Sequence, residues 1–152
     1  MSVPAEKSFE QWLAEANGGN VQAMLTVGVY YIFGEGVVEP NFESAEFWLK
    51  KAADCDNLDA LLALGIAYDD AQLGHCNKAE AYKYFKRAAD HGSTDAIFKV
   101  AQYLITGVGV PANVDEGLKM MRQAAELGNI DAQAALHQMH HHHGPDCDCG
   151  GN

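Results

Sequence analysis

Three observations on this sequence predict an all-α fold, an α/α superhelical solenoid of tandem helix-turn-helix repeats with a period of 36–37 residues. An alanine recurs at Ala23, Ala60, Ala96 and Ala132, at spacings of 37, 36 and 36 residues. Apolar residues around it recur at intervals of three and four, as on an amphipathic helix, and no alternating strand pattern competes. Helix-capping residues recur with the same period. Repeats of this length are typical of stacked helix pairs.

The first predicted element is a capping helix over residues 8–17, "SFEQWLAEAN". Ser8 and Gln11 have the spacing of a capping box, and we expect Trp12 to be the main anchor of this helix. Its pattern is that of the second helix of an otherwise missing repeat. Such a helix would cover the open N-terminal end of the solenoid.

The repeats themselves follow in order, each with a first and a second helix. A residue whose side-chain oxygen can accept a first-turn N–H precedes every helix. Glycines that suit a left-handed C′ position follow several of them. The first helices begin after Asn20, Asn57, Ser93 and Asn129, the second helices after Asn41, Asn77 and Asn113, and the C′ glycines are Gly19, Gly92 and Gly128.

The predicted domain organisation is a solenoid over residues 1–139 and a flexible His/Cys-rich tail over residues 140–152. The solenoid contains the capping helix, three full repeats at about 20–126 and a half repeat from 129. The second helices each carry an alanine pair late in their sequence, where two helix axes can come close.

These residues resemble the SEL-1-like repeat, a relative of the tetratricopeptide repeat, over about residues 12–139. The sequence departs from that pattern in four places. In the second repeat, the segment "DDAQLGHCN" replaces the glycine loop. Elsewhere, Ala101 is found where the pattern has a glycine, Gly117 where it has an alanine, and Asp56 where the other repeats have a C′ glycine. The resemblance rests on the loops "GEGV" and "GVGV" and on Ala45, Trp48, Lys51, Ala52, Ala53, Ala60, Leu64, Gly65 and Tyr68.

The resemblance implies a non-enzymatic adaptor that holds a protein or peptide along the surface of its first helices. By helical spacing, the predicted partner-binding residues are Thr26, Tyr30, Asp70, Lys99, Gln102 and Tyr103. Tyr30 and Tyr103 occupy the same repeat position, seven residues after the recurring alanine. Tyrosines are favoured at interfaces, but a tyrosine half-buried between repeats would fit the same pattern. Trp48 is predicted to be a core residue.

Composition narrows the class of partner. The chain has 21 acidic and 10 basic residues, a net charge of −11, so nucleic acid and anionic membrane surfaces are not expected partners and a basic protein or peptide is favoured. Apolar runs such as residues 27–33 are far shorter than the roughly 20 residues of a membrane span. The first residues lack the apolar region of a secretory signal, and the four cysteines follow no period, so we expect a cytoplasmic protein with reduced thiols.

Catalytic motifs are not found. The sequence has no nucleophile elbow, P-loop or zinc-protease motif, and its paired glycines are accounted for by the repeat loops. Cys55 has no pattern that would make it a nucleophile. The chain is therefore predicted not to be an enzyme and to require no cofactor.

The tail, "HQMHHHHGPDCDCGGN", offers an alternative function in metal handling. Imidazole nitrogens and thiolates suit zinc, nickel and copper. The same composition would also fit an incidental chelator or a residual affinity tag. A weaker site is conceivable at His75 and Cys76 with Asp69 and Asp70. The predicted tail ligands are His137, His140, His141, His143, Cys147 and Cys149.

Overall fold

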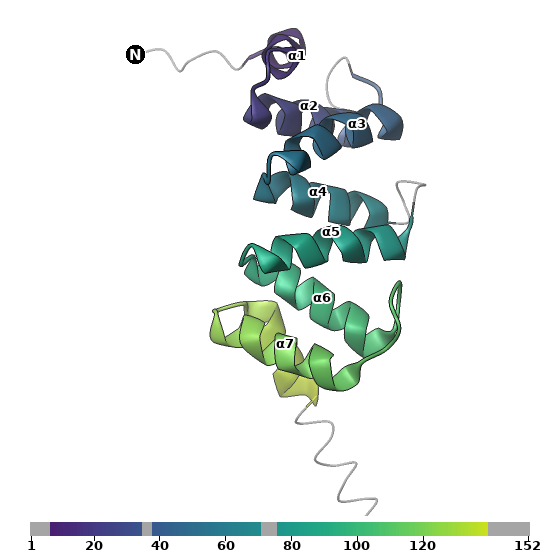
Figure 1. Cartoon of the computed structure of the whole chain (residues 1–152), viewed down its shortest axis with the longest axis vertical. Coiled ribbons are helices and arrows are strands. Elements are labelled where there is room, and N and C mark those ends of the chain that lie inside the picture. The colour runs from purple at the N-terminus through teal and green to yellow at the C-terminus, as the bar shows by residue number, and fades with distance from the viewer. Residues whose placement is uncertain (1–6, 35–37, 71–75, 140–152) are drawn as a thin grey trace, which may run out of the picture. The chain divides into compact units, whose positions relative to one another are not determined.

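The computed structural model describes residues 7–34, 38–70 and 76–139, and within these ranges every regular element is a helix (Figure 1). The all-α prediction is thus confirmed. None of these helices is long and apolar enough to cross a membrane. The helices are α1 (Phe9–Asn17), α2 (Val21–Phe33), α3 (Phe42–Asp54), α4 (Leu58–Asp69), α5 (Lys78–Asp90), α6 (Thr94–Thr106) and α7 (Val114–Glu126), and residues 130–139 are helical as well.

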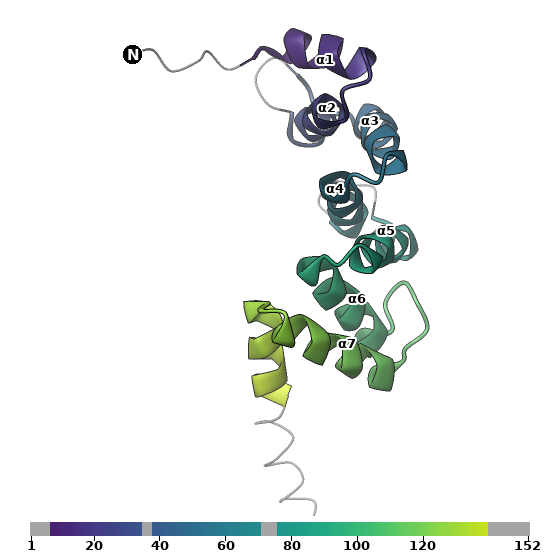
Figure 2. The same cartoon turned by 60° about the vertical axis from the view of Figure 1, so that its left-hand side comes forward.

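The contacts of the chain define two compact units, residues 1–84 (unit 1) and residues 85–152 (unit 2), with the boundary inside α5. Helical repeats contact mainly their neighbours in sequence, so a repeat chain divides readily into such units. In unit 1, α2 contacts α1, α3 and α4. Figure 2 shows α2 nearly end-on between α1 and α3. In unit 2, α6 contacts α7.

The predicted caps of the first helices are present, and each cap bonds to the recurring alanine. The side chain of Asn20 accepts a hydrogen bond from the backbone N–H of Ala23 at 3.1 Å. Asn57, Ser93 and Asn129 do the same for Ala60, Ala96 and Ala132, at 2.9, 3.2 and 2.7 Å. The alanine recurs with the cap because its N–H is the donor that the cap satisfies, while its small side chain is fully buried.

Each asparagine that begins a second helix has two functions. Its side chain caps that helix, as Asn41 does by accepting from the backbone N–H of Ser44 at 3.1 Å. Its backbone N–H donates to a carbonyl near the end of the preceding first helix, which closes the helix pair. These closing bonds are Asn41 to Tyr31 at 2.7 Å, Asn77 to Tyr68 at 2.8 Å and Asn113 to Leu104 at 2.7 Å.

The left-handed C′ positions were also predicted correctly. Gly19, Gly92 and Gly128 have φ values of 98°, 90° and 99°. Asp56 takes the same place with φ 57°, and it is the one non-glycine residue with a positive φ among those that the structure describes. The backbone geometry of the repeat is therefore kept even where its glycine is missing.

The capping helix α1 makes the contact with α2 that α3 makes with α4. Phe9 packs edge-on against Tyr31 with ring centroids 5.4 Å apart, and Phe42 packs in the same way against Tyr68, also at 5.4 Å. Trp12, the residue predicted to be the main anchor of this helix, is partly buried, with the Lys7 ammonium 4.6 Å from the centre of its ring. A nine-residue helix buries only a narrow stripe, and here that stripe centres on Ala16.

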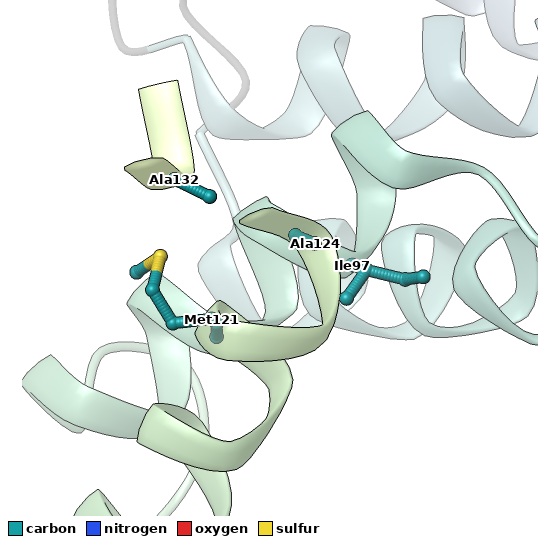
Figure 3. Packing of buried hydrophobic residues seen from close by; sticks show 5 residues of the cluster. Ile97, Met121, Ala124 and Ala132 are labelled. Carbon is teal, nitrogen blue, oxygen red and sulfur yellow. The ribbon is translucent and has the colours of Figure 1, made fainter. Parts of the chain in front are cut away.

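Alanine is the commonest buried hydrophobic residue in both units. In unit 1 the alanine pair of α3 is buried beside Leu49, Leu61 and Leu64, and Trp48 is 7% exposed, so Trp48 is a core residue as predicted. A core cluster of unit 2 joins α6, α7 and the helical residues 130–139, as Figure 3 shows. It consists of Ile97, Ala101, Met121, Ala124 and Ala132.

Candidate functional site

A partner is predicted from the sequence to bind the first helices, which are α2 and α4 in unit 1 and α6 in unit 2, and each of these helices is described by itself. Residues three, six and ten positions after the recurring alanine lie on one face of a helix, and all of them keep some solvent exposure. We call this set the first-helix surface. It comprises Thr26, Val29 and Phe33 on α2, Ala63, Ile66 and Asp70 at α4, and Lys99, Gln102 and Thr106 on α6.

Four of the six predicted partner-binding residues belong to this set, and each is half-buried: Thr26, Asp70, Lys99 and Gln102. The hydroxyl of Thr26 donates to the carbonyl of Gln22 at 2.9 Å, so this polar group is already used within the helix. Asp70 ends α4 and its backbone N–H donates to the carbonyl of Ile66. Thr26 and Asp70 lie in unit 1, whereas Lys99 and Gln102 lie in unit 2.

The two predicted tyrosines have different surroundings despite their common repeat position. Tyr30 is half-buried, and its ring packs edge-on against Phe9 at 5.7 Å. Tyr103 is only 6% exposed, and its ring packs against Phe85 of α5 at 6.0 Å. Tyr103 is thus a core residue of unit 2 that leaves little area for a partner. The difference follows from the neighbouring helix, since the short α1 covers Tyr30 less completely.

Two exposed apolar residues of the first-helix surface were missed by the sequence reasoning. Phe33 is 63% exposed and Ile66 is 52% exposed. The signal that would have found them is repeat position, because Ile66 aligns with Gln102, and Phe33 aligns with Asp70 and Thr106. Positions that are polar in one repeat and apolar in another are not fixed by the core.

The titratable groups of unit 1 with shifted pKa values form hydrogen bonds within α3 or between neighbouring helices. Burial, and then a 2.8 Å hydrogen bond that Tyr68 donates to Glu46, raise the pKa of the Tyr68 phenol. The same carboxylate accepts from Lys50 at 2.7 Å and raises the pKa of that ammonium. Lys78 donates to the carbonyl and the carboxylate of Asp69, and the carboxylate bond raises its pKa. These bonds fix α3, α4 and the start of α5.

The predicted metal ligands fall mostly outside the described residues. His137 is exposed on the helical residues 130–139. The other tail ligands, His140, His141, His143, Cys147 and Cys149, lie beyond them, as does His75 of the weaker site. Within residues 7–34, 38–70 and 76–139 no group of three or more His, Cys, Asp or Glu side chains is placed to hold a metal ion. Cys55 and Cys76 are exposed free thiols.

Comparison with known proteins identifies the repeat. The family model described as Sel1 repeat matches three times in succession, at residues 21–57, 58–93 and 94–129. Among curated proteins, DAP3-binding cell death enhancer 1 of Rattus norvegicus is 32% identical over 98 residues, which is 64% of this chain and 19% of that protein. An uncharacterized protein of Neisseria meningitidis is 27% identical over 86% of this chain and 26% of its own length. The chain thus spans a minor part of these relatives.

Solved structures show the same fold. The c5321 protein of uropathogenic Escherichia coli, described as a protective antigen with an SLR fold, superposes with a TM-score of 0.80 at 26% identity. That match covers 88% of this chain and 28% of c5321. A Sel1 repeat protein from Oxalobacter formigenes gives a TM-score of 0.69 at 28% identity, covering 85% of this chain and 96% of that one.

Proposed function

We propose that this chain, which belongs to the Sel1 repeat family, is a non-enzymatic scaffold that docks a protein or peptide on its first-helix surface. Sel1 repeat proteins are generally non-catalytic scaffolds that bind other proteins. The finer assignment, to particular residues of this chain, is ours.

The observation that carries the proposal is the exposure of large apolar side chains on the first-helix surface of unit 1. Phe33 and Ile66 are more than half exposed, and the helices that carry them, α2 and α4, contact each other. Burying what remains exposed of each side chain against a partner would contribute roughly 1 kcal/mol. Such apolar residues beside polar neighbours are typical of the centre and the rim of an interface.

Charge indicates the class of partner. The net charge of −11 favours a basic protein or peptide. Acidic side chains also stand beside the apolar ones, since Asp70 belongs to the first-helix surface and Asp59 is exposed in the first turn of α4. A basic partner would be attracted by the whole chain and held by the apolar residues.

The test compares two surface variants as baits in extracts of the source cells. In Phe33→Ser/Ile66→Ser the apolar residues of the first-helix surface are removed. Phe47→Ser is the matched control, because Phe47 is 52% exposed, as Ile66 is, but lies on the second helix α3. The proposal predicts a partner that the unmodified chain and Phe47→Ser enrich and that the double variant loses. Identical enrichment by all three baits, with equal melting temperatures, would contradict it.

A second candidate function rests on the tail composition. Five histidines and two cysteines between residues 137 and 152 form a donor set that suits zinc, nickel or copper. Titration of zinc and nickel into the reduced chain, against a competing chelator, tests whether binding is tight and stoichiometric. A chain that ends at Met139 is the control. Metal binding that protects Cys147 and Cys149 from alkylation would support metal handling, and weak binding with reactive thiols would reject it.

A further inference from the structure

We infer that a cleft in unit 1 accepts an arginine side chain of the docked partner. The inference rests on the proposed function, since the arginine belongs to the protein or peptide that the scaffold holds. The cleft has a volume of about 450 Å³ and lies where α1, α2 and the segment before α3 meet. It is lined by Phe9, Glu10, Tyr31, Val38, Glu39, Pro40 and Asn41.

The two carboxylates of this cleft, like Glu43 on α3, are not paired with a lysine, whereas the remaining described glutamates of unit 1 are. Glu15, Glu46 and Glu80 each form an ion pair with a lysine. Glu10 and Glu39 are exposed, and neither has an ion-pair or hydrogen-bond partner among the residues that the structure describes. The described lining contains no lysine or arginine. The cleft therefore carries two negative charges that a cation from outside can pair with.

The cleft wall also contains aromatic rings, on which a guanidinium group can stack. Phe9 and Tyr31 both line the cleft and pack edge-on against each other at 5.4 Å. The Phe9 ring also packs against Tyr30 at 5.7 Å, which connects the cleft wall to a residue predicted to bind the partner. A planar guanidinium stacks on aromatic rings and pairs with carboxylates at its edge, whereas an ammonium group offers a more strongly hydrated point charge. The lining thus favours arginine over lysine.

The backbone that bears Glu39 is held in place on both sides. Gly34 ends α2 in the left-handed conformation at φ 68°, and a Cβ atom there would lie 2.4 Å from the Pro40 ring. On the other side, the backbone N–H of Asn41 donates to the Tyr31 carbonyl at 2.7 Å, while its side chain caps α3. A cleft that is fixed before binding loses little entropy when a side chain enters.

Small probes test the cleft separately from the partner. The full chain, labelled with ¹⁵N, is titrated with the blocked amino acids N-acetyl-arginine methylamide, N-acetyl-lysine methylamide and N-acetyl-citrulline methylamide, and amide chemical shifts are followed. Citrulline has nearly the shape of arginine without its charge. The inference predicts saturable shifts at Phe9, Glu10, Tyr31 and Asn41 with the arginine compound, weaker binding of the lysine compound and no saturable shifts with citrulline.

A charge-matched pair of variants shows whether the cleft carboxylates are responsible. Glu10→Gln/Glu39→Gln should weaken binding of the arginine compound about tenfold, the loss expected for two partly exposed ion pairs. Glu43→Gln/Asp54→Asn removes the same charge from exposed positions of unit 1 outside the cleft and should leave the affinity within about twofold. Shifts spread over the acidic surface, equal binding of the lysine compound, or equal losses in both variants would overturn the inference.

The outcomes also separate this inference from the proposed function. A partner that is lost with Phe33→Ser/Ile66→Ser but bound equally by Glu10→Gln/Glu39→Gln would uphold the scaffold and reject the arginine cleft. Arginine binding without any partner that depends on Phe33 and Ile66 would uphold the cleft chemistry and reject the docking surface.

Discussion

At the scale of single residues, Asp56 marks the place where this sequence departs from its own repeat. Its φ of 57° lies in the left-handed region that Gly19, Gly92 and Gly128 occupy at the equivalent positions. A Cβ atom makes that conformation unfavourable, although aspartate tolerates it better than most residues. The strain is local, because the neighbouring hydrogen bond from the Asp56 N–H to the Ala53 carbonyl is kept at 2.9 Å.

Two substitutions at this position separate backbone strain from side-chain contacts. Both Asp56→Gly and Asp56→Ala remove the carboxylate, but only alanine keeps a Cβ atom at the positive φ. We therefore expect Asp56→Gly to be more stable than Asp56→Ala by about 1 kcal/mol. Urea denaturation followed by circular dichroism measures the difference. Equal free energies of unfolding would show that the left-handed conformation imposes no cost here.

The Tyr68 hydroxyl is a second residue whose contribution can be measured. It is 7% exposed and donates to Glu46, so Tyr68→Phe should lower the free energy of unfolding by about 1 kcal/mol. Tyr31→Phe is the control, because Tyr31 occupies the same repeat position and its hydroxyl has no hydrogen bond within the described part of the chain. A loss of equal size in both variants would assign the effect to the removal of a hydroxyl group in general rather than to the bond with Glu46.

The pH dependence of the same variant has a defined sign. Because the folded state raises the pKa of Tyr68, the phenol ionises more readily in the unfolded chain. This contribution to stability is complete below the unfolded pKa of about 10 and declines as the pH rises above that value. The stability difference between the unmodified chain and Tyr68→Phe should therefore shrink above about pH 10. A difference that grew with pH would contradict this description of the site.

At the scale of helices, glycine and alanine exchange places between the repeats. In the first repeat Gly28 lies on α2 and faces α3, where an added Cβ would lie 2.6 Å from Leu49 and 3.4 Å from the Ala45 carbonyl. In the third repeat the glycine is on the second helix, and a Cβ on Gly117 would lie 2.6 Å from Ile105 and 3.0 Å from the Ala101 carbonyl. The first and third helix pairs thus each keep one glycine where their axes approach, and two apparent departures from the repeat pattern compensate each other.

This exchange predicts non-additive effects on stability. Gly117→Ala should destabilise unit 2 by about 1–3 kcal/mol, because the new methyl group meets the backbone of α6. Ala101→Gly should cost about 1 kcal/mol of helix propensity. The double variant should be more stable than the sum of the two losses by at least about 0.5 kcal/mol. Strict additivity in a double-mutant cycle, measured by denaturation, would mean that the two positions do not share one contact.

Helices and caps were predictable from sequence because their causes are local. Asn20 and Asn113 each indicate the start of a helix, because their side-chain oxygens can accept a hydrogen bond from a first-turn N–H. The period of the apolar residues then predicts the length of the helix and its buried face. The site was predicted only in part, because exposure depends on which helix covers a position. Tyr30 and Tyr103 have the same position in the repeat, but Tyr30 packs against Phe9 of the short α1 and Tyr103 packs against Phe85 of α5. The cleft at Phe9 and Glu39 brings together residues that no repeat pattern connects.

At the scale of the whole molecule, the excess of acidic residues affects partner association. Exposed charges are screened over about 10 Å at 0.1 M salt and about 3 Å at 1 M. For a basic partner, the association rate should fall about tenfold between 0.05 and 0.5 M sodium chloride, with a smaller change in the dissociation rate. Surface plasmon resonance with the enriched partner measures both rates. An association rate independent of salt would contradict charge-assisted docking.

Site-specific photocrosslinking in the source cells shows whether a partner docks on the first-helix surface. A photoreactive phenylalanine is placed at position 66 on α4 or, as control, at position 47 on α3, two positions of equal exposure. We expect one crosslinked protein from position 66, attached through a segment that contains arginine, and its absence from position 47. No crosslink at position 66, or the same products at both positions, would contradict it.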